Sequence, residues 1–189
     1  MREPRRPSRM WTCDAWSEWP VGYDKLELES GHPIGPKSMQ RRLGPFRRSL
    51  VELNVIAHLG RYVFPRNLGY IGPGFGFVGH AGWALHPPDL AFIRTERLPA
   101  EPLWDRLSPV APDLAIEVLT PVDEAERVAE EVHAYLAGGV ALLWVADPQR
   151  RIVSVHAPRQ PRRFLHDTDV LDGGNVLPDF RAEVAALFQ

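Results

Sequence analysis

The sequence predicts one α/β domain, and three observations lead to this fold class. Two apolar, strand-like segments at 89–93 and 113–119 each contain an acidic residue. The second is followed by an amphipathic segment at 121–137, which has the spacing of a helix with one apolar face. A wholly apolar segment at 140–146 then has the character of a buried strand. Strands that alternate with helices in this way predict a central sheet covered by helices.

The predicted domain spans residues 23–189, and residues 1–22 form an N-terminal arm. The arm contains three prolines, four arginines and three tryptophans but no apolar run, so it does not resemble a secretory signal. The single cysteine, Cys13, excludes an internal disulfide and suits a reducing compartment. No stretch approaches the ~20 apolar residues of a membrane span. We therefore expect a cytoplasmic protein with no membrane partner.

The charge of the chain is low but unevenly distributed. The net charge is -2, with ten Lys/Arg and six Asp/Glu in residues 1–50 and twelve and eighteen in the remainder. This balance gives no global electrostatic argument for binding nucleic acid. Lysine occurs only at Lys25 and Lys37, and arginine supplies every other basic side chain except histidine.

The first half of the domain predicts a strand, a helix and a pair of extended strands. Between residues 23 and 34, apolar and acidic side chains alternate before a glycine, which indicates a short strand and a turn. Pro45 can begin a helix that runs to about Val63, and Pro65 ends it. The Gly-rich and aromatic segment 69–88 lacks helical periodicity and indicates hairpin strands.

The second half predicts a strand, a helix and two further strands. After the strand 113–119, Thr120 can cap a helix that has Pro121 at its first position, and the glycines 138 and 139 end it. The remaining predicted elements are strands at 140–146 and 151–156, a turn at 172–174 and a short helix that ends at Phe188.

Two carboxylates in this pattern have the arrangement that a divalent cation requires. Asp89 begins one strand and Glu117 lies inside another, so the two can face each other at ~5 Å if the strands are neighbours. Asp113 shares a strand with Glu117, but four residues separate them by roughly 13 Å. Asp113 is therefore the weaker ligand. Nucleases of the PD-(D/E)XK type use two such carboxylates to bind Mg²⁺.

Other polar motifs have more ordinary interpretations. The segment 74–79 matches G-x-G-x-x-G, but no helix follows, so we reject a dinucleotide site. His80 and His86 lack the further ligands of a zinc site. Four arginines, at 41, 42, 47 and 48, flank the start of the first helix. Exposure to solvent is their expected state, and contact with phosphates is the alternative.

A set of short motifs resembles one protein family in order and spacing. The motifs are A-P-D-L-A-I-E-V-L-T-P at 111–121, Y-L-A-G-G-V at 135–140 and L-W-V-A-D-P at 143–148, with P-D-L-A-F at 88–92, E-R-L-P at 96–99 and L-D-G-G at 171–174. Together they resemble the Uma-two family (DUF820) of restriction-endonuclease-like proteins. The resemblance extends from about Leu26 to the end and is strongest after Pro87.

This resemblance implies a restriction-endonuclease-like fold with a mixed central β-sheet flanked by helices. It also implies a Mg²⁺- or Mn²⁺-dependent endonuclease whose partner is DNA, with Asp89 and Glu117 as catalytic metal ligands. Glu27, in a weak match to the family's Tyr-Glu-Leu-x-x-Gly start, becomes a third catalytic residue and outer ligand. Formation of a homodimer is left open.

The sequence departs from the family at one position of the predicted helix. The family supplies a lysine there, and the matching residue in this chain is Glu131. Arg127 lies one turn earlier, but its guanidinium cannot act as a base at neutral pH. Two hypotheses follow. The chain is a metal-dependent endonuclease, or it is a catalytically inactive relative that keeps the fold to bind nucleic acid or a protein partner.

Overall fold

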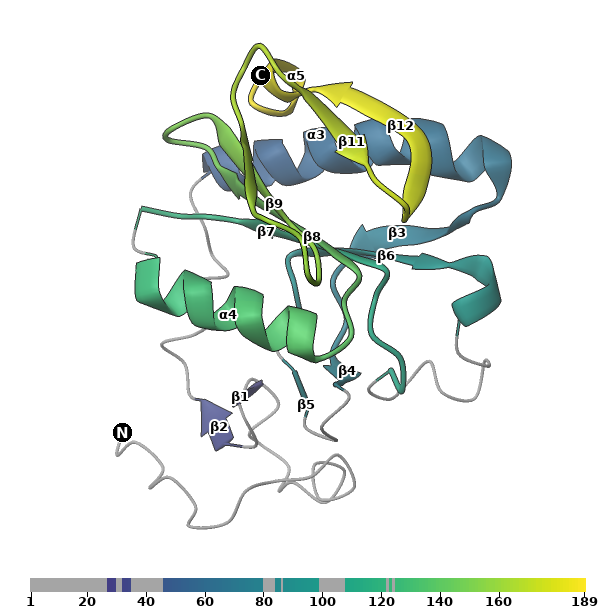
Figure 1. Ribbon diagram of the computed structural model, residues 1–189, viewed down its shortest axis with the longest axis vertical. Coiled ribbons are helices and arrows are strands. Elements are labelled where there is room, and N and C mark those ends of the chain that lie inside the picture. Colours follow the sequence, from purple (N-terminus) through teal and green to yellow (C-terminus); the bar gives the residue numbers. More distant parts are fainter. Residues whose placement is uncertain are drawn as a thin grey trace.

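The computed structural model describes residues 46–79, 87–98, 108–121, 123 and 125–189 in full, and strand pairing at 27–29, 32–34 and 84–85. The predicted arm at 1–22 lies outside the described residues. The described part is built around a six-stranded mixed sheet (Figure 1). In spatial order its strands are β10 (Arg163–Leu165), β9 (Ile152–His156), β8 (Leu142–Asp147), β7 (Leu114–Val118), β6 (Leu90–Arg94) and β3 (Gly69–Pro73).

Neighbouring strands of this sheet run antiparallel, except that β7 and β8 run parallel. Parallel neighbours need a crossover connection, and helix α4 (Ala125–Ala137) lies between these two strands in the sequence. β6, β7 and β8 are almost wholly buried. Their continuous apolar sequences are typical of strands that are covered on both faces.

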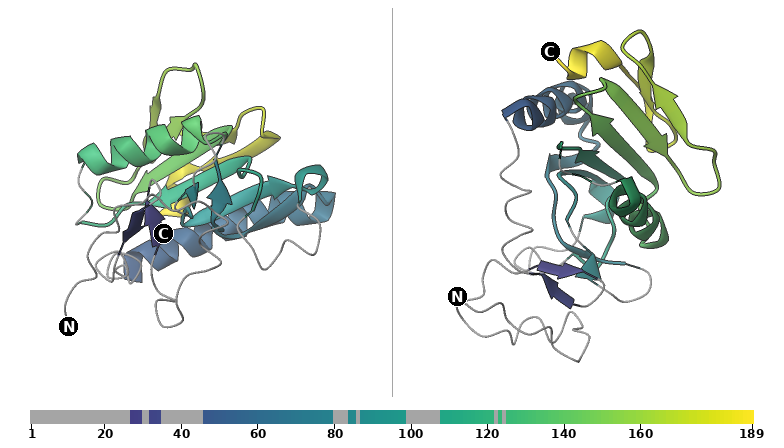
Figure 2. Two further views of the ribbon diagram at one scale, coloured as in Figure 1. Left: turned by 90° about the horizontal axis from the view of Figure 1, so that it is seen from below. Right: turned by 90° about the vertical axis from the view of Figure 1, so that its left-hand side faces the viewer.

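The two faces of the sheet carry separate apolar cores. Helix α3 (Phe46–Val63) covers one face together with the hairpin of β11 (Val170–Gly173) and β12 (Leu177–Glu183) and the short helix α5 (Val184–Leu187). Helix α4 covers the other face, as both views in Figure 2 show. Because successive strand residues point to opposite faces, Ile116 and Val118 belong to the first core and Ala115 to the second.

The helix expected from Pro45 to Val63 is confirmed as α3, and the 3-10 turn Phe64–Arg66 follows it. The expected start of the second helix is wrong. α4 begins at Ala125, and Thr120 does not cap it. Instead, Asp123 accepts hydrogen bonds from the backbone N–H and the hydroxyl of Thr120, at 2.7 and 2.8 Å. This turn satisfies the polar groups of Thr120 locally and delays the helix by four residues.

The segment 69–88 forms extended strands, but not one local hairpin. Its first strand, β3, pairs with β6, and the 3-10 turn Thr95–Arg97 follows β6. Its later strands, β4 (Phe77–Val78) and β5 (Ala84–Leu85), pair with each other. Residues 27–29 and 32–34 form the antiparallel strands β1 and β2, and β1 lies against β5. The strand and turn expected at 23–34 are therefore a small hairpin.

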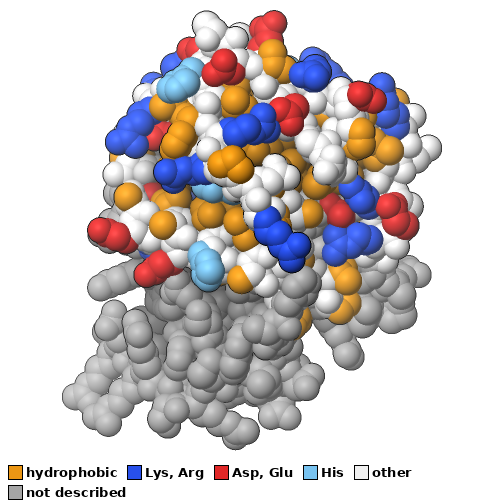
Figure 3. Space-filling model, in the orientation of Figure 1, with side chains coloured by type: hydrophobic (Ala, Val, Ile, Leu, Met, Phe, Trp, Pro, Cys, Tyr) orange, Lys and Arg blue, Asp and Glu red, His pale blue; other side chains and the backbone are white. Residues whose placement is uncertain are grey.

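The surface of the described residues carries mixed charge. On the face shown in Figure 3, acidic and basic side chains are interspersed among apolar ones. None of the described helices combines the length and apolar character needed to cross a membrane.

Candidate active site

Asp89 and Glu117 lie opposite each other at one end of the ladder between the neighbouring strands β6 and β7. Leu90 pairs with Ile116 in the antiparallel ladder of β6 and β7, so the next position along the ladder places Asp89 across from Glu117. The backbone N–H of Val118 donates a hydrogen bond of 2.8 Å to Oδ2 of Asp89. This bond fixes the carboxylate of Asp89 at the end of β7. The two residues that the sequence paired therefore line the same pocket.

Arg48 reaches this site from helix α3. Its Nη2 donates to Oδ1 of Asp89, and its Nε donates to Oε1 of Glu52 at 2.8 Å. The side chains of Arg48 and Asp89 are only 11% and 12% exposed. The expectation that the arginines at the helix start are mainly solvated is therefore wrong for Arg48. Its charge lies within the site, where a low dielectric strengthens the attraction to the carboxylate.

The surroundings of Glu117 favour its protonated form. Its side chain points to the α4 side of the sheet, where the Tyr135 hydroxyl donates a hydrogen bond of 2.7 Å to Oε1. Burial raises the pKa of Glu117 to about 8. The Tyr135 hydrogen bond, which lowers the pKa, is the next largest influence, and the charge of Glu131 adds to the increase. Arg48 and Arg127 lower it slightly.

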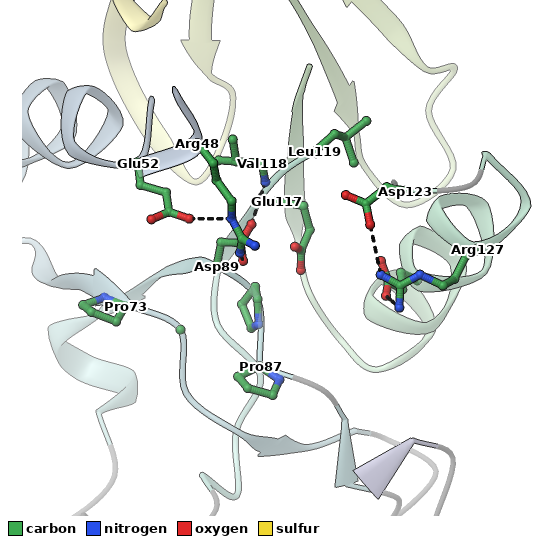
Figure 4. A pocket seen from close by; sticks show the side chains of 13 residues that line it. Arg48, Glu52, Pro73, Pro87, Asp89, Glu117, Val118, Leu119, Asp123 and Arg127 are labelled. Atoms are coloured by element: carbon green, nitrogen blue, oxygen red, sulfur yellow. Dashed lines mark hydrogen bonds and ion pairs between the residues drawn. The ribbon is translucent and has the colours of Figure 1, made fainter. Parts of the chain in front are cut away.

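The α4 side of the site is formed by Arg127 and two carboxylates. Nη1 of Arg127 pairs with Glu131 at 2.8 Å, and Nη2 pairs with Asp123 at 3.4 Å. Glu131 therefore faces the site, as its place in the sequence predicted, and at the same time it pairs with Arg127. Figure 4 shows Glu117 between the Arg48–Asp89 pair on one side and the Arg127–Asp123 pair on the other.

These residues line one pocket of about 240 Å³. It is lined by the end of β7 and by a wall formed from Pro73 and Gly74, at the end of β3, and Pro87 and Pro88, before β6. Pro73 and Pro87 are seen in Figure 4. The N–H of Gly74 donates to the Asp89 carbonyl oxygen at 3.0 Å. A Cβ at Gly74 would collide with the carbonyl oxygen of Pro88, so only glycine permits this close approach. The wall therefore holds the backbone of Asp89 in place.

The side chains at this site supply some of the oxygen ligands that a hard divalent cation requires. Asp89 and Glu117 offer carboxylate oxygens, which Mg²⁺ and Mn²⁺ prefer, and the pocket has room for water as the remaining ligands. Among the residues that the structure describes, no three Asp, Glu, His or Cys side chains are grouped to hold a metal ion. Magnesium sites often use one or two carboxylates and several waters, so a carboxylate pair fits such an ion.

The other two carboxylates considered from the sequence differ in their positions. Asp113 is buried away from the pocket, where it accepts from the backbone N–H of Arg94 at 3.0 Å and pairs with Arg97 at 2.7 Å. This structural role agrees with its ranking from the sequence as the weaker ligand candidate. Glu27 lies on β1, and its side chain is outside the described residues.

Two residues of the site were not identified from the sequence. Tyr135 occupies the apolar stripe of α4, and its spacing gave no sign that its hydroxyl meets Glu117. Arg48 was one of four similar arginines. The only available signal was Glu52 at the i+4 position, which is the usual spacing of an ion pair on a helix.

Comparison with known proteins identifies relatives of the chain. The Uma2 family model, described as "Putative restriction endonuclease", matches residues 39–185. A solved structure, described as a "putative nuclease belonging to DUF820" from Anabaena variabilis, aligns with a TM-score of 0.77 over 94% of this chain and 97% of that chain, at 19% sequence identity. No curated protein matches the chain. The similarity at this identity confirms the expected nuclease-like fold.

Proposed function

Because the chain belongs to the Uma2 family of restriction-endonuclease-like proteins, we propose that it is a Mg²⁺- or Mn²⁺-dependent endonuclease that hydrolyses DNA phosphodiester bonds. The observation that carries the proposal is the juxtaposition of Asp89, directly before β6, and Glu117, on the paired strand β7, in a pocket lined mainly by charged side chains. Both residues act as metal ligands and catalytic residues in this proposal.

Asp89 and Glu117 differ in how they would bind the cation. Oδ2 of Asp89 is fixed by the N–H of Val118, and Oδ1, which accepts from Arg48, is the oxygen proposed to bind the cation. Glu117 is oriented by Tyr135, and near neutral pH its proton is retained. A divalent cation beside Glu117 favours the ionised form, because opposite charge lowers the pKa of a carboxyl group. In this proposal Glu117 is therefore protonated in the metal-free protein and ionised when it binds the cation.

A bound divalent ion would lower the pKa of the attacking water and neutralise charge on the scissile phosphate. The chain itself supplies the walls of the pocket and two guanidinium groups. Arg127 cannot accept a proton, because the pKa of a guanidinium is far above neutral. It is therefore proposed as a stabiliser of phosphate charge. Glu131 pairs with it and reduces its net charge at the site.

Glu27 remains in the proposal as an outer ligand. It lies on β1, which is next to β5, and the chain enters the pocket wall directly after β5, at Pro87. An outer ligand would complete the shell through water, which is common for Mg²⁺. Glu27→Ala is expected to weaken Mn²⁺ binding less than Glu117→Ala does.

Nicking of supercoiled DNA with Mg²⁺ or Mn²⁺ tests the proposal. Wild type is compared with Glu117→Ala and with Glu130→Ala, a matched control on the exposed side of α4. Cleavage by wild type and by Glu130→Ala, lost with EDTA and in Glu117→Ala, supports the proposal. Cleavage that survives in Glu117→Ala would come from another site or a contaminant and would contradict it.

A second candidate function is that of an inactive nuclease fold that binds nucleic acid or a protein partner. The observation that favours it is the Arg48–Asp89 ion pair together with Glu131 at the position where the family has a lysine. Retention of DNA by wild type without any cleavage, and unchanged by EDTA, would support this alternative.

A further inference from the structure

Arg48 makes two side-chain contacts in the site, one within helix α3 and one with Asp89. Its Nε is bonded to Glu52, one turn away on the same helix, at 2.8 Å. Its terminal Nη2 extends to Oδ1 of Asp89, directly before β6. The stem of the side chain is therefore anchored by Glu52, while the end of the guanidinium lies over the carboxylate. An arginine that served only the solubility of α3 would not be 11% exposed.

Both oxygens of Asp89 are engaged in this arrangement. Oδ2 accepts from the backbone N–H of Val118, and that bond belongs to the junction of β6 with β7. Oδ1 accepts from Arg48, and both residues line the pocket. A cation shared by Asp89 and Glu117 needs this oxygen. Arg48 and the cation are both positive, so they cannot occupy the same place at Oδ1.

We propose that Arg48 competes with the divalent cation for Oδ1 of Asp89 and that, once released, its guanidinium binds the phosphate of the substrate. This inference rests on the proposed metal site and assigns a further active-site residue to it. Arg48 thus neutralises Asp89 in the metal-free protein and contacts the substrate in the loaded one.

The phosphate is the natural second partner for several reasons. Glu52 keeps Arg48 at the wall of the pocket, so the released group stays beside the reacting atoms. A guanidinium offers a planar pair of donors that matches phosphate oxygens. The chain has no lysine after Lys37, so no ammonium from α4 can take this role. Arg127, the other arginine lining the pocket, pairs with Asp123 and Glu131 on the α4 side, so its proposed contact with the phosphate comes from the other side of the site.

Calorimetric titration of the full chain with Mn²⁺ alone tests the competition. Arg48→Met is expected to bind Mn²⁺ about tenfold more tightly than wild type. Arg47→Met is the matched control, because Arg47 is the exposed neighbour on the same helix, and its affinity is expected to equal that of wild type. Arg127→Met removes a positive charge from the same pocket without touching Asp89, so its gain should be clearly smaller. Arg48→Gln, which keeps a donor, serves if Arg48→Met does not fold.

The outcomes separate this inference from the proposed function. Equal affinity in wild type and the Arg48 variants would overturn the competition and leave the metal site intact. An equal gain in Arg127→Met would show a general effect of charge and would also overturn it. Absence of Mn²⁺ binding in wild type and in every variant would overturn the metal site itself, and this inference with it.

Cleavage of supercoiled DNA at saturating Mn²⁺ tests the contact with phosphate. Arg48→Met is expected to be at least tenfold slower than wild type although it binds the ion more tightly, whereas Arg47→Met keeps the wild-type rate. Tighter binding with an unchanged or higher rate would overturn the substrate role of Arg48.

Discussion

The hydroxyl of Tyr135 donates a hydrogen bond of 2.7 Å to Oε1 of Glu117 and so connects helix α4 to the end of β7. The bond stabilises the ionised carboxylate, but burial outweighs it and leaves the pKa of Glu117 at about 8. At neutral pH the metal-free protein therefore keeps a proton on one of its two proposed ligands. The first two predictions follow from this balance.

The stability of the metal-free protein should fall as pH rises from about 4.5 to about 8. In this range the folded protein holds the Glu117 proton and the unfolded chain releases it, so each increase in pH favours unfolding. The slope from this group is at most about 1.4 kcal/mol per pH unit. Urea unfolding in EDTA at pH 5, 6, 7 and 8 measures it. Glu117→Gln should flatten the profile, whereas Glu130→Gln, on the exposed side of α4, should not. A wild-type profile with the same slope as Glu117→Gln would contradict a raised pKa.

Binding of Mn²⁺ should release a proton below pH 8. The cation binds the ionised form of Glu117, so the apparent affinity should rise with pH and level off above about 8. Calorimetry in two buffers of different ionisation enthalpy counts the released proton directly. Asp89→Asn serves as a comparison, because it removes one ligand but leaves the titrating group in place. Affinity that does not change between pH 6 and 8 would be inconsistent with a protonated Glu117.

Glu131→Lys should raise Mn²⁺-dependent nicking on the order of tenfold or more. The change removes a negative charge beside Glu117 and places an ammonium on the same side of the site. It also breaks the i,i+4 pair with Arg127, and because pairs of this spacing contribute about 0.2–0.5 kcal/mol, the thermal midpoint should change little. Rates of nicking by wild type and by the variant are compared at saturating Mn²⁺. Equal rates in two active proteins would show that this site does not need the lysine.

Asp113→Asn should destabilise the protein without affecting the metal. Asp113 is buried and satisfies both the Arg94 backbone and the Arg97 guanidinium, so the loss of its charge should cost about 1–3 kcal/mol. Asp167→Asn removes an exposed pair with Arg151 and should cost less than ~1 kcal/mol. Urea unfolding compares the two variants, and calorimetry with Mn²⁺ should give wild-type affinity for Asp113→Asn. A loss of Mn²⁺ affinity in that variant would return Asp113 to the list of candidate ligands.

The sequence was sufficient for the parts of the fold that depend on local periodicity. The apolar runs of β7 and β8, the prolines at both ends of α3 and the glycines after α4 carry their own signals. Pairing between distant segments has no such signal, and so β3 was assigned to a local hairpin although it pairs with β6. Thr120 followed by Pro121 has the sequence of a helix N-cap. Instead, the carboxylate of Asp123 accepts hydrogen bonds from the N–H and the hydroxyl of Thr120.

The candidate site shows the same difference between features that local sequence predicts and features that depend on distant contacts. Asp89 and Glu117 could be paired because the geometry of neighbouring strands limits which carboxylates can meet. Arg48 and Tyr135 come from helices on opposite faces of the sheet, and their contacts depend on how those helices are placed over β6 and β7. One arginine among four, or one tyrosine within an apolar stripe, cannot be singled out by spacing.

The bond from the Val118 N–H to Asp89 gives the site a built-in spectroscopic reporter. Most amide protons in the sheet bond to peptide carbonyls, whose charge does not change, but this one bonds to a carboxylate. Its chemical shift should therefore move when Arg48 leaves Asp89, when the carboxylate is protonated, or when a cation is bound. One resonance in an amide NMR spectrum of the folded protein would then follow the occupancy of the site in solution, with no label introduced into the pocket.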